Sequence, residues 1–469
     1  PGVQALLKEL ARANPGLCVL TTRIQVEDLA HTLGKSTQRL ELENLSPEAG
    51  AQLLQSLGVI GTDKELQQAC ADFGGHALAL NLLGRYLAVV HEGEIRKRDL
   101  IPKLTEEERH GGHARRVMLS YEKWLHDTPE LNILHLMGLF DRPAAKGALD
   151  TLRAEPTIAG LTDKLHDLAE AKWQYAVQHL RDLRLLAAKE AHQVDSAHDK
   201  RPDTLDCHPL VREHFGEKLR QQNPAAWKEA HCRLYEFYKN LPDKHLPDTL
   251  EEMEPLFAAV THACQAGQHK EALNEIYISR ILRNASYSWR KLGSFGADLA
   301  AISCFFSQPC IDPINSLNVF EKGFVLRHAA SYLKALGRLS EATLSYQTAL
   351  KLEIDIKNWR SANMVASDLS EIYMMVGSMP EALQYAQMSV EQSDKSHDNW
   401  KRIARRAFLA YVLLQCGRTS DAETVFHEAT TLQKKYQNES QLKYAKWAFQ
   451  YCELLFVQGK YKEIENHPF

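Results

Sequence analysis

The chain has 469 residues, which suffices for about three domains and is too many for one hydrophobic core. Its 44% hydrophobic and 25% charged residues are typical of a soluble globular protein, and a net charge of −4 gives no reason to expect a polyanionic partner such as DNA. No apolar run approaches the roughly 20 residues of a bilayer-spanning helix, so no membrane partner is expected. The nine cysteines stand singly, without C-x-x-C pairs. We therefore expect reduced thiols, a cytoplasmic location and no metal site.

Residues 1–44 begin with a short amphipathic helix that is expected to end near Asn14-Pro15-Gly16. The next run, Cys18-Val19-Leu20-Thr21-Thr22-Arg23, is typical of a buried parallel strand with polar residues at its carboxyl end. Ligands of open α/β sheets bind beyond such ends, which makes Thr22 and Arg23 candidate site residues. One helix and one strand cannot form a sheet, so we expect most of this α/β domain to lie upstream.

A small helical domain is predicted over residues 45–92. Ser46 can cap its first helix, because a serine side chain accepts from first-turn amides, and Pro47 suits the first helical position. A glycine pair, Gly74-Gly75, separates the other two helices. These two helices are predicted from about Lys64 to Phe73 and from about Ala77 to Val90.

Residues 93–220 have the element order of a winged-helix domain. Several helices are followed by one over Trp173–Leu185 and then by a hairpin. The hairpin is predicted to consist of the arms Leu185–Ala188 and Thr204–Cys207 and the polar tip Asp195–Lys200. The helix before it exposes only Arg181 and Arg184 as cations, whereas a helix that reads a DNA groove usually carries a denser basic face. Nucleic acid is therefore not an expected partner.

The rest of the chain is repetitive. Three segments align on a glycine, with a spacing of 40 residues both times, and Gly267 and Gly459 lie in the same pattern. The segments are Gly337-Arg-Leu-Ser-Glu-Ala342, Gly377-Ser-Met-Pro-Glu-Ala382 and Gly417-Arg-Thr-Ser-Asp-Ala422. Each predicts a helix that ends on a left-handed glycine, a three-residue turn and an antiparallel partner helix. Because one pair cannot bury both of its faces, the pairs are expected to stack into a solenoid.

Local signals refine this prediction. Helix starts are expected at Ser340, Pro380 and Ser420, the last with Glu423 as a capping box. The alanine five residues after each glycine should let the paired helices approach closely. The larger side chains four residues further on should fill the gap to the next repeat; they include Tyr346 and Phe426.

These segments resemble tetratricopeptide repeats in a longer form of about 40 residues, most clearly from about 320 to 465. Between 220 and 320 only the neighbourhoods of Gly267 and Gly293 fit the pattern. The resemblance implies a superhelix over residues 221–469 whose groove binds a protein or peptide ligand.

Residues 1–220 resemble the distal part of the NB-ARC module of STAND signalling ATPases. Leu20-Thr21-Thr22-Arg23 resembles the family's sensor strand, whose arginine reaches toward the γ-phosphate. Phe73-Gly74-Gly75-His76-Ala77-Leu78-Ala79-Leu80 resembles the GLPLAL motif, whose proline lies against the adenine. Cys207-His208-Pro209-Leu210-Val211-Arg212 resembles the MHD motif, whose histidine touches the β-phosphate of ADP. The order of the three motifs, with the expected helices between them, makes the resemblance specific.

The resemblance implies a site for ADP or ATP. Its residues in this chain would be Thr22, Arg23, Gly75, Ala77 and His208. Ala77 stands in place of the family proline, which removes a rigid adenine contact, and Pro209 stands in place of the aspartate of the MHD motif. The sequence has no G-x-x-x-x-G-K-[ST] loop and no acidic strand end for Mg²⁺. ATP hydrolysis with Mg²⁺ is therefore expected only together with an upstream P-loop half.

Each of these residues also has a purely structural interpretation. Arg23 could simply end a strand, Thr22 could be a strand former, and His208 could be a structural histidine of the winged helix. Gly74-Gly75 could be an ordinary helix C-cap.

Three functions remain open at this point. The first is the sensor and regulatory part of a nucleotide-switched STAND ATPase, in which the winged helix latches ADP at rest and the nucleotide domains self-associate on activation. The second is an interaction scaffold with a non-functional NB-ARC remnant. The third is a transcription activator whose DNA-binding domain lies outside this chain. An enzyme acting through this chain alone is the least favoured, because no nucleophile–base pair stands out in the sequence.

Overall fold

The computed structural model describes residues 2–22, 26–102, 112–188, 204–437 and 445–465. As predicted, the protein is mainly α-helical. It divides into two compact units, Pro1–Phe237 and Tyr238–Phe469. None of the helices within the described ranges is both long enough and apolar enough to cross a bilayer.

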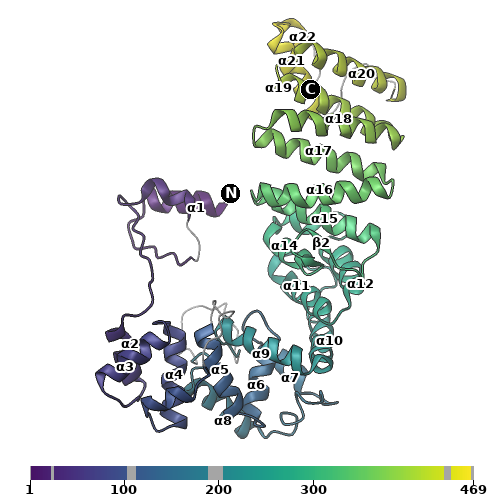
Figure 1. Cartoon of the computed structure of the whole chain (residues 1–469). Helices are drawn as coiled ribbons and strands as arrows, with labels where there is room; N and C mark the ends of the chain where they lie inside the picture. The colour runs from purple at the N-terminus through teal and green to yellow at the C-terminus, as the bar shows by residue number, and fades with distance from the viewer. Residues whose placement is uncertain (1, 23–25, 103–111, 189–203, 438–444, 466–469) are drawn as a thin grey trace. The chain divides into compact units, whose positions relative to one another are not determined.

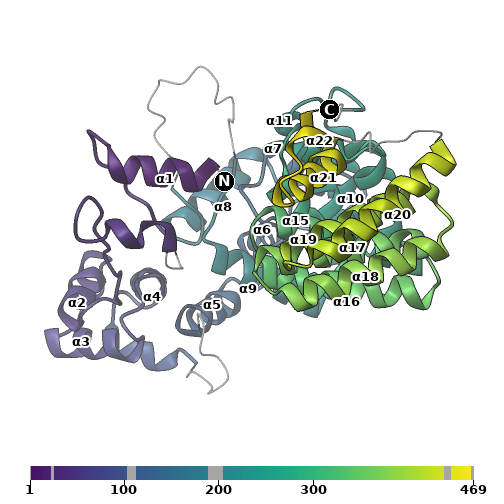
Figure 2. The ribbon, with the colours of Figure 1, turned by 90° about the horizontal axis from the view of Figure 1, so that it is seen from above.

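The first unit begins with four α-helices that correspond closely to those predicted and two 3-10 helices that were not predicted. They are α1 (Gly2–Arg12), the 3-10 helix η1 (Glu27–Thr32), α2 (Pro47–Ser56), α3 (Asp63–Asp72), α4 (Ala77–Val90) and the 3-10 helix η2 (Ile95–Leu100). Ser46 caps α2 by accepting a hydrogen bond from the amide of Ala49, and Pro47 is its first residue, as expected. α4 is apolar on nearly all sides, which is typical of a buried helix. Figure 2 shows it nearly end-on between α2 and α5.

The second part of this unit holds the predicted winged-helix region. Its helices are α5 (Gly112–Trp124), α6 (Pro129–Met137), α7 (Lys146–Arg153), α8 (Glu170–Asp182), α9 (Pro209–Gln222) and α10 (Pro224–Asn240). Ala144 and Leu205 exchange two backbone hydrogen bonds of 2.8 and 3.0 Å, and the amide of Ala187 donates to the carbonyl of Asp206 at 2.8 Å. The two predicted hairpin arms, Leu185–Ala188 and Thr204–Cys207, are therefore joined by the hydrogen bond between Ala187 and Asp206. The tip, Asp195–Lys200, lies outside the described residues, and the winged-helix assignment stays a prediction.

The predicted strand over Cys18–Arg23 is wrong for the residues that the structure describes. Residues 17–22 have no regular secondary structure, and Leu17 and Val19 are 91% and 75% exposed. A strand of this kind is defined by hydrogen-bonding neighbours and by layers that bury both of its faces. An apolar, β-branched run without such neighbours has nothing to hold it in a sheet.

The second unit contains an irregular part followed by regular helix pairs. The irregular part consists of α11 (Leu250–Gln265), α12 (His269–Glu271), the π-helix η3 (Ala272–Ile281), α13 (Tyr287–Lys291), α14 (Phe295–Ser303) and the small hairpin of β1 (Phe306–Gln308) and β2 (Asp312–Pro313). The pairs are α15 (Val319–Ala335) with α16 (Leu339–Asp355), α17 (Trp359–Met375) with α18 (Met379–Lys395), α19 (Asn399–Gln415) with α20 (Thr419–Gln437), and α21 (Ala445–Val457) with α22 (Tyr461–Glu465). Figure 1 shows α15 to α20 stacked in chain order, which confirms the predicted solenoid.

One backbone arrangement joins the two helices of each pair. At Gly337, whose φ is +78°, the glycine amide donates to Lys334 O at 3.1 Å and the amide of Arg338 donates to Leu333 O at 2.9 Å. These two bonds form a Schellman motif, and the carbonyl of Arg338 then accepts the first bond of α16, from the amide of Ala342. The same closing bonds occur at Gly267, Gly377, Gly417 and Gly459. The predicted three-residue turn on a left-handed glycine is therefore confirmed.

The predicted caps differ from the observed ones. The residue after each glycine already supplies the first carbonyl of the next helix, so α16 and α20 begin at Leu339 and Thr419, one residue earlier than expected. The capping box on Ser420 is wrong, because the carboxylate of Glu423 instead accepts from Nζ of Lys460 at 2.7 Å.

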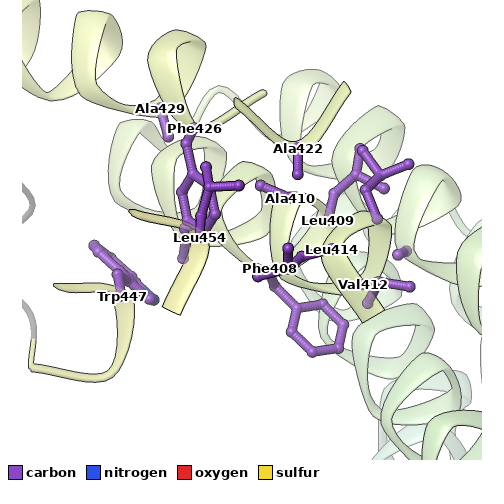
Figure 3. Close-up of a cluster of buried hydrophobic side chains, with 14 of the residues drawn as sticks. Phe408, Leu409, Ala410, Val412, Leu414, Ala422, Phe426, Ala429, Trp447 and Leu454 are labelled. Atoms are coloured by element: carbon purple, nitrogen blue, oxygen red, sulfur yellow. The ribbon is translucent and has the colours of Figure 1, made fainter. Parts of the chain in front are cut away.

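The predicted packing between helices is confirmed. The alanines after the glycines are fully buried, and Tyr346 and Phe426 are 1% and 0% exposed. Figure 3 shows one of the resulting clusters, in which Phe426 of α20 and Leu454 of α21 belong to the same core as Phe408 of α19. Successive repeats therefore share one continuous hydrophobic core.

Candidate functional site

The glycine pair of the GLPLAL-like segment ends α3. Gly74 and Gly75 have φ angles of +60° and +63°, and their amides donate to Ala71 O and Cys70 O, both at 2.9 Å. Gly75 is also pressed against the chain at Leu45: its carbonyl accepts from the Leu45 amide at 2.8 Å, and a Cβ there would lie 2.4 Å from Leu45 O. Glycine is required here by the backbone itself. Gly74-Gly75 therefore forms the C-cap of α3, which is the structural interpretation given above. A C-cap of this kind does not prevent the same segment from binding a ligand.

His76 and Ala77 form the start of α4. His76 is the N-cap, and its Nδ1 accepts a hydrogen bond from the amide of Ala79 at 3.2 Å. Ala77 is the first helical residue and is exposed. Proline is favoured at this position because its missing N–H has no intrahelical partner, which explains in physical terms why a related motif can carry proline here.

His208 has the same local role at the start of α9. It is the N-cap, its Nδ1 accepts from the amide of Leu210 at 3.2 Å, and Pro209 is the first helical residue. A neutral imidazole that accepts at Nδ1 carries its proton on Nε2. The Nε2–H groups of His76 and His208 are therefore donors available to a ligand.

An acidic residue that the sequence reasoning missed holds the turn before α9. Asp206 forms an ion pair with Arg212, which is 8% exposed, and its Oδ1 accepts from the amide of Cys207 at 2.7 Å. The pair fixes the turn that carries His208. The sequence signal is an acid two residues before the N-cap and an arginine four residues after it, a spacing that is too common to single out this pair.

The GLPLAL-like and MHD-like segments both adjoin α5: the guanidinium of Arg116 lies over the Phe73 ring, and Nη2 of Arg115 donates to Glu213 of α9 at 2.6 Å. Loss of hydration lowers the pKa of His208, and the nearby His76 ring, which when protonated would repel a second positive charge, lowers it further. His113, in the first turn of α5, is a neighbour of His76: burial lowers its pKa, as do the charge of Arg116 and the proximity of His76. Its ring lies over Gly74, where an added Cβ would be 2.9 Å from Nε2.

Arg116 fastens this region to the end of α3. Its guanidinium lies 3.6 Å from the centre of the Phe73 ring, and its Nη2 donates to the carbonyl of Asp72 at 2.5 Å. The turn that carries His76 is thereby tied to α5. The starts of α4 and α5 therefore place His76 and His113 in one neighbourhood.

The five predicted site residues have different outcomes. Gly75, Ala77 and His208 lie in the two segments that the fold brings together. Thr22 is exposed in the segment between α1 and η1, and Arg23 lies outside the described residues. Nothing here assigns a nucleotide contact to either of them.

Among the described residues, no group of three or more histidine, cysteine, aspartate or glutamate side chains is arranged to hold a metal ion. The chemistry that the site offers is therefore that of imidazole N–H donors and helix N-termini. Helix N-termini carry unpaired amides and partial positive charge, which favours anions.

Neither the protein-family models nor the curated proteins contain a match. Among solved structures, the chain is similar to a STAND protein (signal transduction ATPase with numerous domains) with a tetratricopeptide repeat sensor, from Pyrococcus horikoshii, at 16% identity and a TM-score of 0.33. The match covers 91% of this chain and 60% of that protein, so this chain spans less than two thirds of its length.

Proposed function

We propose that this chain is the regulatory and sensing part of a nucleotide-dependent signalling switch. The observation that carries the proposal is that α5 contacts both segments whose histidines, His76 and His208, cap a helix. Each presents an Nε2–H donor at a helix N-terminus, and His113 lies beside the turn that carries His76. Donors and positive helix ends in one place suit the phosphates of an adenine nucleotide.

His208 can bind such a ligand in its neutral state, without taking up a proton. His208 is neutral near pH 7 because its pKa is lowered, and its Nδ1 acts as a cap. As a neutral donor it could hydrogen-bond a phosphate oxygen through Nε2–H while it keeps α9 capped. The Asp206–Arg212 ion pair fixes the turn that carries His208, and so it would keep the His208 imidazole oriented toward the phosphate.

In this proposal the winged-helix region is a latch. At rest, His208 would hold ADP between its own turn, the Gly74–Ala77 turn and an upstream phosphate-binding half that supplies the P-loop and Mg²⁺. A protein or peptide ligand bound to the repeats would favour the open state and so permit exchange for ATP. This requires that the ligand binds the open state more tightly than the closed one.

Nucleotide retention tests the latch directly. Protein that includes the upstream half should be purified, denatured and analysed for released adenine nucleotide by chromatography. We expect close to one ADP per chain, and His208→Ala should weaken ADP affinity about tenfold through loss of a hydrogen bond to a charged group. His427→Ala, which removes an exposed histidine from α20, is the matched control and should retain ADP as the wild type does.

The scaffold is the competing function, and the departures at Ala77 and Pro209 favour it. Well-folded protein that carries no nucleotide and binds no added ADP would support the scaffold and exclude the latch. If His208→Ala and His427→Ala lose ADP equally, His208 does not contact the nucleotide.

A further inference from the structure

Helix α9 is held by imidazole side chains at two separate points. At its start, Nδ1 of His208 accepts the hydrogen bond from the amide of Leu210, which is possible only while that nitrogen carries no proton. Further along the helix, the ring centre of Phe215 lies 6.0 Å from that of His135 on α6 and 4.9 Å from that of His214. Titratable rings therefore take part both in the cap of α9 and in its contact with α6.

The crossing of α6 and α9 leaves no room for adjustment. Gly138 and Gly216 meet there backbone to backbone, so that a Cβ on either would collide with the other. Within the described ranges, the buried Nε2 atom of His135 has no hydrogen-bond partner. A proton taken up by this ring would create a buried charge without a partner, which is unfavourable unless the crossing opens to water.

A carboxylate of α5 lies at this crossing, but three groups of α9 already share it. Oε2 of Glu122 lies 3.6 Å from Nε2 of His214 and 3.6 Å from Nζ of Lys218, and its Oε1 accepts from Nε2 of Gln222 at 3.2 Å. A charged His135 would add a positive charge beside Lys218, with one carboxylate to serve both. Glu122 alone therefore cannot make protonation of the closed crossing favourable.

The other ion pairs around α6 and α9 are complete without His135. Arg115 of α5 binds Glu213 and Glu217 of α9 at 2.6 and 2.8 Å. On the α8 side of α6, Nδ1 of His179 lies 2.9 Å from Oε1 of Glu130. Because these carboxylates already have partners, they offer no ready counter-charge at the crossing.

The pKa values agree with two uncharged rings in the closed structure. Burial lowers the pKa of His135 to about 4, with Glu122 raising it and His214 lowering it. Loss of hydration lowers the pKa of His208, and the His76 ring lowers it further. In a released helix both pKa values would return toward the ordinary value of about 6.5. The released state therefore binds more protons than the closed state, and its population rises as the pH falls below that value.

We propose that mild acid releases α9 through proton uptake at two imidazoles, that of His208 at its start and that of His135 across the crossing with α6. The two protons act together because one helix carries both contacts. The consequence for ADP rests on the proposed function, since a released α9 would carry His208 away from the phosphate. Release of the helix itself needs no nucleotide, so it can be measured on this chain alone.

The test is hydrogen exchange of α9 in the full chain, followed by mass spectrometry at pH 7, 6 and 5 and corrected for the intrinsic exchange rate at each pH. His135 alone should raise the opening constant of α9 about twentyfold between pH 7 and pH 5, because its pKa would change from about 4 to about 6.5 on release. His208 should increase this rise further. Helix α17 contains no histidine and is the reference within the same sample.

Two variants separate the two imidazoles. His135→Leu removes the ring at the crossing, whereas His208→Asn leaves the core untouched and keeps an N-cap, because asparagine also accepts from first-turn amides. Each should remove part of the pH dependence, and the double variant should reduce it to that of α17. His427→Asn changes an exposed histidine of α20 and is the matched control, which should respond as the wild type does. Circular dichroism at pH 7 checks that each variant is folded.

Opening of α9 that rises no more steeply than that of α17 would overturn the proposal. A full pH dependence in His208→Asn or in the double variant would overturn it as well. ADP retention at pH 7 and pH 5.5, measured on protein that includes the upstream half, separates this proposal from the nucleotide latch. Absence of ADP at both pH values, together with release of α9 in acid, contradicts the latch alone.

Discussion

Two histidines in the first unit use the same ring nitrogen for the same purpose. His76 and His208 both cap a helix through Nδ1, so the proton of each neutral ring is directed outward on Nε2. Protonation would replace the accepting nitrogen by a donor and remove the cap. The structural role and the proposed binding role therefore favour the same neutral tautomer.

The position of Ala77 allows a direct test of the family resemblance. Ala77 is the first residue of α4, and His76 before it has φ −69° and ψ 110°, in the extended region that proline imposes on the residue before it. We expect Ala77→Pro to raise the free energy of unfolding by about 0.5 to 1 kcal/mol, because proline restricts the unfolded chain. Urea denaturation measures the change.

Ala79→Pro is the matched control for this substitution. The amide of Ala79 donates to His76 Nδ1 and its side chain is fully buried, so proline there should destabilise the first unit. If Ala77→Pro destabilises as much as the control, α4 does not begin at residue 77 in solution.

The stability of the first unit should fall in mild acid because of His135. Burial lowers its pKa to about 4, with Glu122 raising it and His214 lowering it. Since the unfolded value is about 6.5, the unfolded chain takes up a proton below that pH while the folded chain does not. Stability is therefore complete above pH 6.5 and declines as the pH falls toward 4. We expect a loss of about 2 kcal/mol between pH 7 and pH 5 from this group.

The variant His135→Leu should remove that part of the pH dependence. The measurement is the difference in unfolding free energy between wild type and variant at pH 7, 6 and 5, which cancels the titration of other histidines. A difference that is the same at all three pH values would show that His135 titrates normally in the folded state.

At the residue scale, the sequence predicted local roles better than partnerships. Ser46 and Pro47 were placed correctly because a cap and a first helical residue depend on the next few amides only. The Asp206–Arg212 pair was missed, because many acids and arginines have compatible spacings and only the folded turn selects one pair. The placement of His76 and His208 depends on how α5 packs against both α4 and α9, which no local pattern contains.

Among the elements, the crossing of α6 and α9 depends on two glycines in contact. A Cβ at Gly216, within α9, would lie 2.6 Å from the carbonyl oxygen of Gly138, and one at Gly138 would lie 2.3 Å from the amide nitrogen of Gly216. Side chains cannot relieve such a contact, because both partners are backbone. The crossing therefore fixes how α9, and with it the His208 turn, sits on the winged-helix region.

Gly216→Ala should destabilise the first unit by about 1 to 3 kcal/mol despite the better helix propensity of alanine. Thermal or urea unfolding measures this. Gly296→Ala is the matched control: it lies in α14 with nothing within 4 Å of the new Cβ, and it should be neutral or slightly stabilising. Equal effects of the two substitutions would mean that the helices separate easily at this crossing.

Element type was predictable where the determining contacts are local. The repeats were found from their glycines because each helix pair is closed by bonds within a few residues. The strand over residues 18–23 was mispredicted because a strand is defined by neighbours, not by its own composition. The π-helix Ala272–Ile281 was not predicted either, since its hydrogen-bond register leaves no distinct pattern of apolar residues.

Over the whole molecule, the repeats differ in how far their apolar side chains are shielded from solvent. Phe449 and Phe456 of α21 are 64% and 63% exposed, whereas the aligned positions of α19, Ala407 and Leu414, are 0% and 8% exposed. At these positions the described residues cover α19 and leave the two phenylalanines of α21 exposed. In a solenoid each repeat is stabilised by its neighbours, so the inner repeats should open less often.

Hydrogen exchange on the full chain should show this gradient. We expect the amides of α21 and α22 to exchange at least about tenfold faster than those of α17 and α18. Mass spectrometry of peptides from the two pairs provides the comparison within one sample. Equal protection would mean that the stack unfolds as a single cooperative unit.

The shared turn at each glycine has a consequence for how such a chain can change over generations. One residue both ends a helix and begins the next, and the pattern returns after 40 residues with the same backbone bonds. An in-frame duplication of any 40 codons within this stretch would insert one full period. The residues after the insertion would therefore keep their positions in the repeat. Recombination could therefore lengthen or shorten the stack by whole repeats, without any requirement that the breakpoints fall at helix ends.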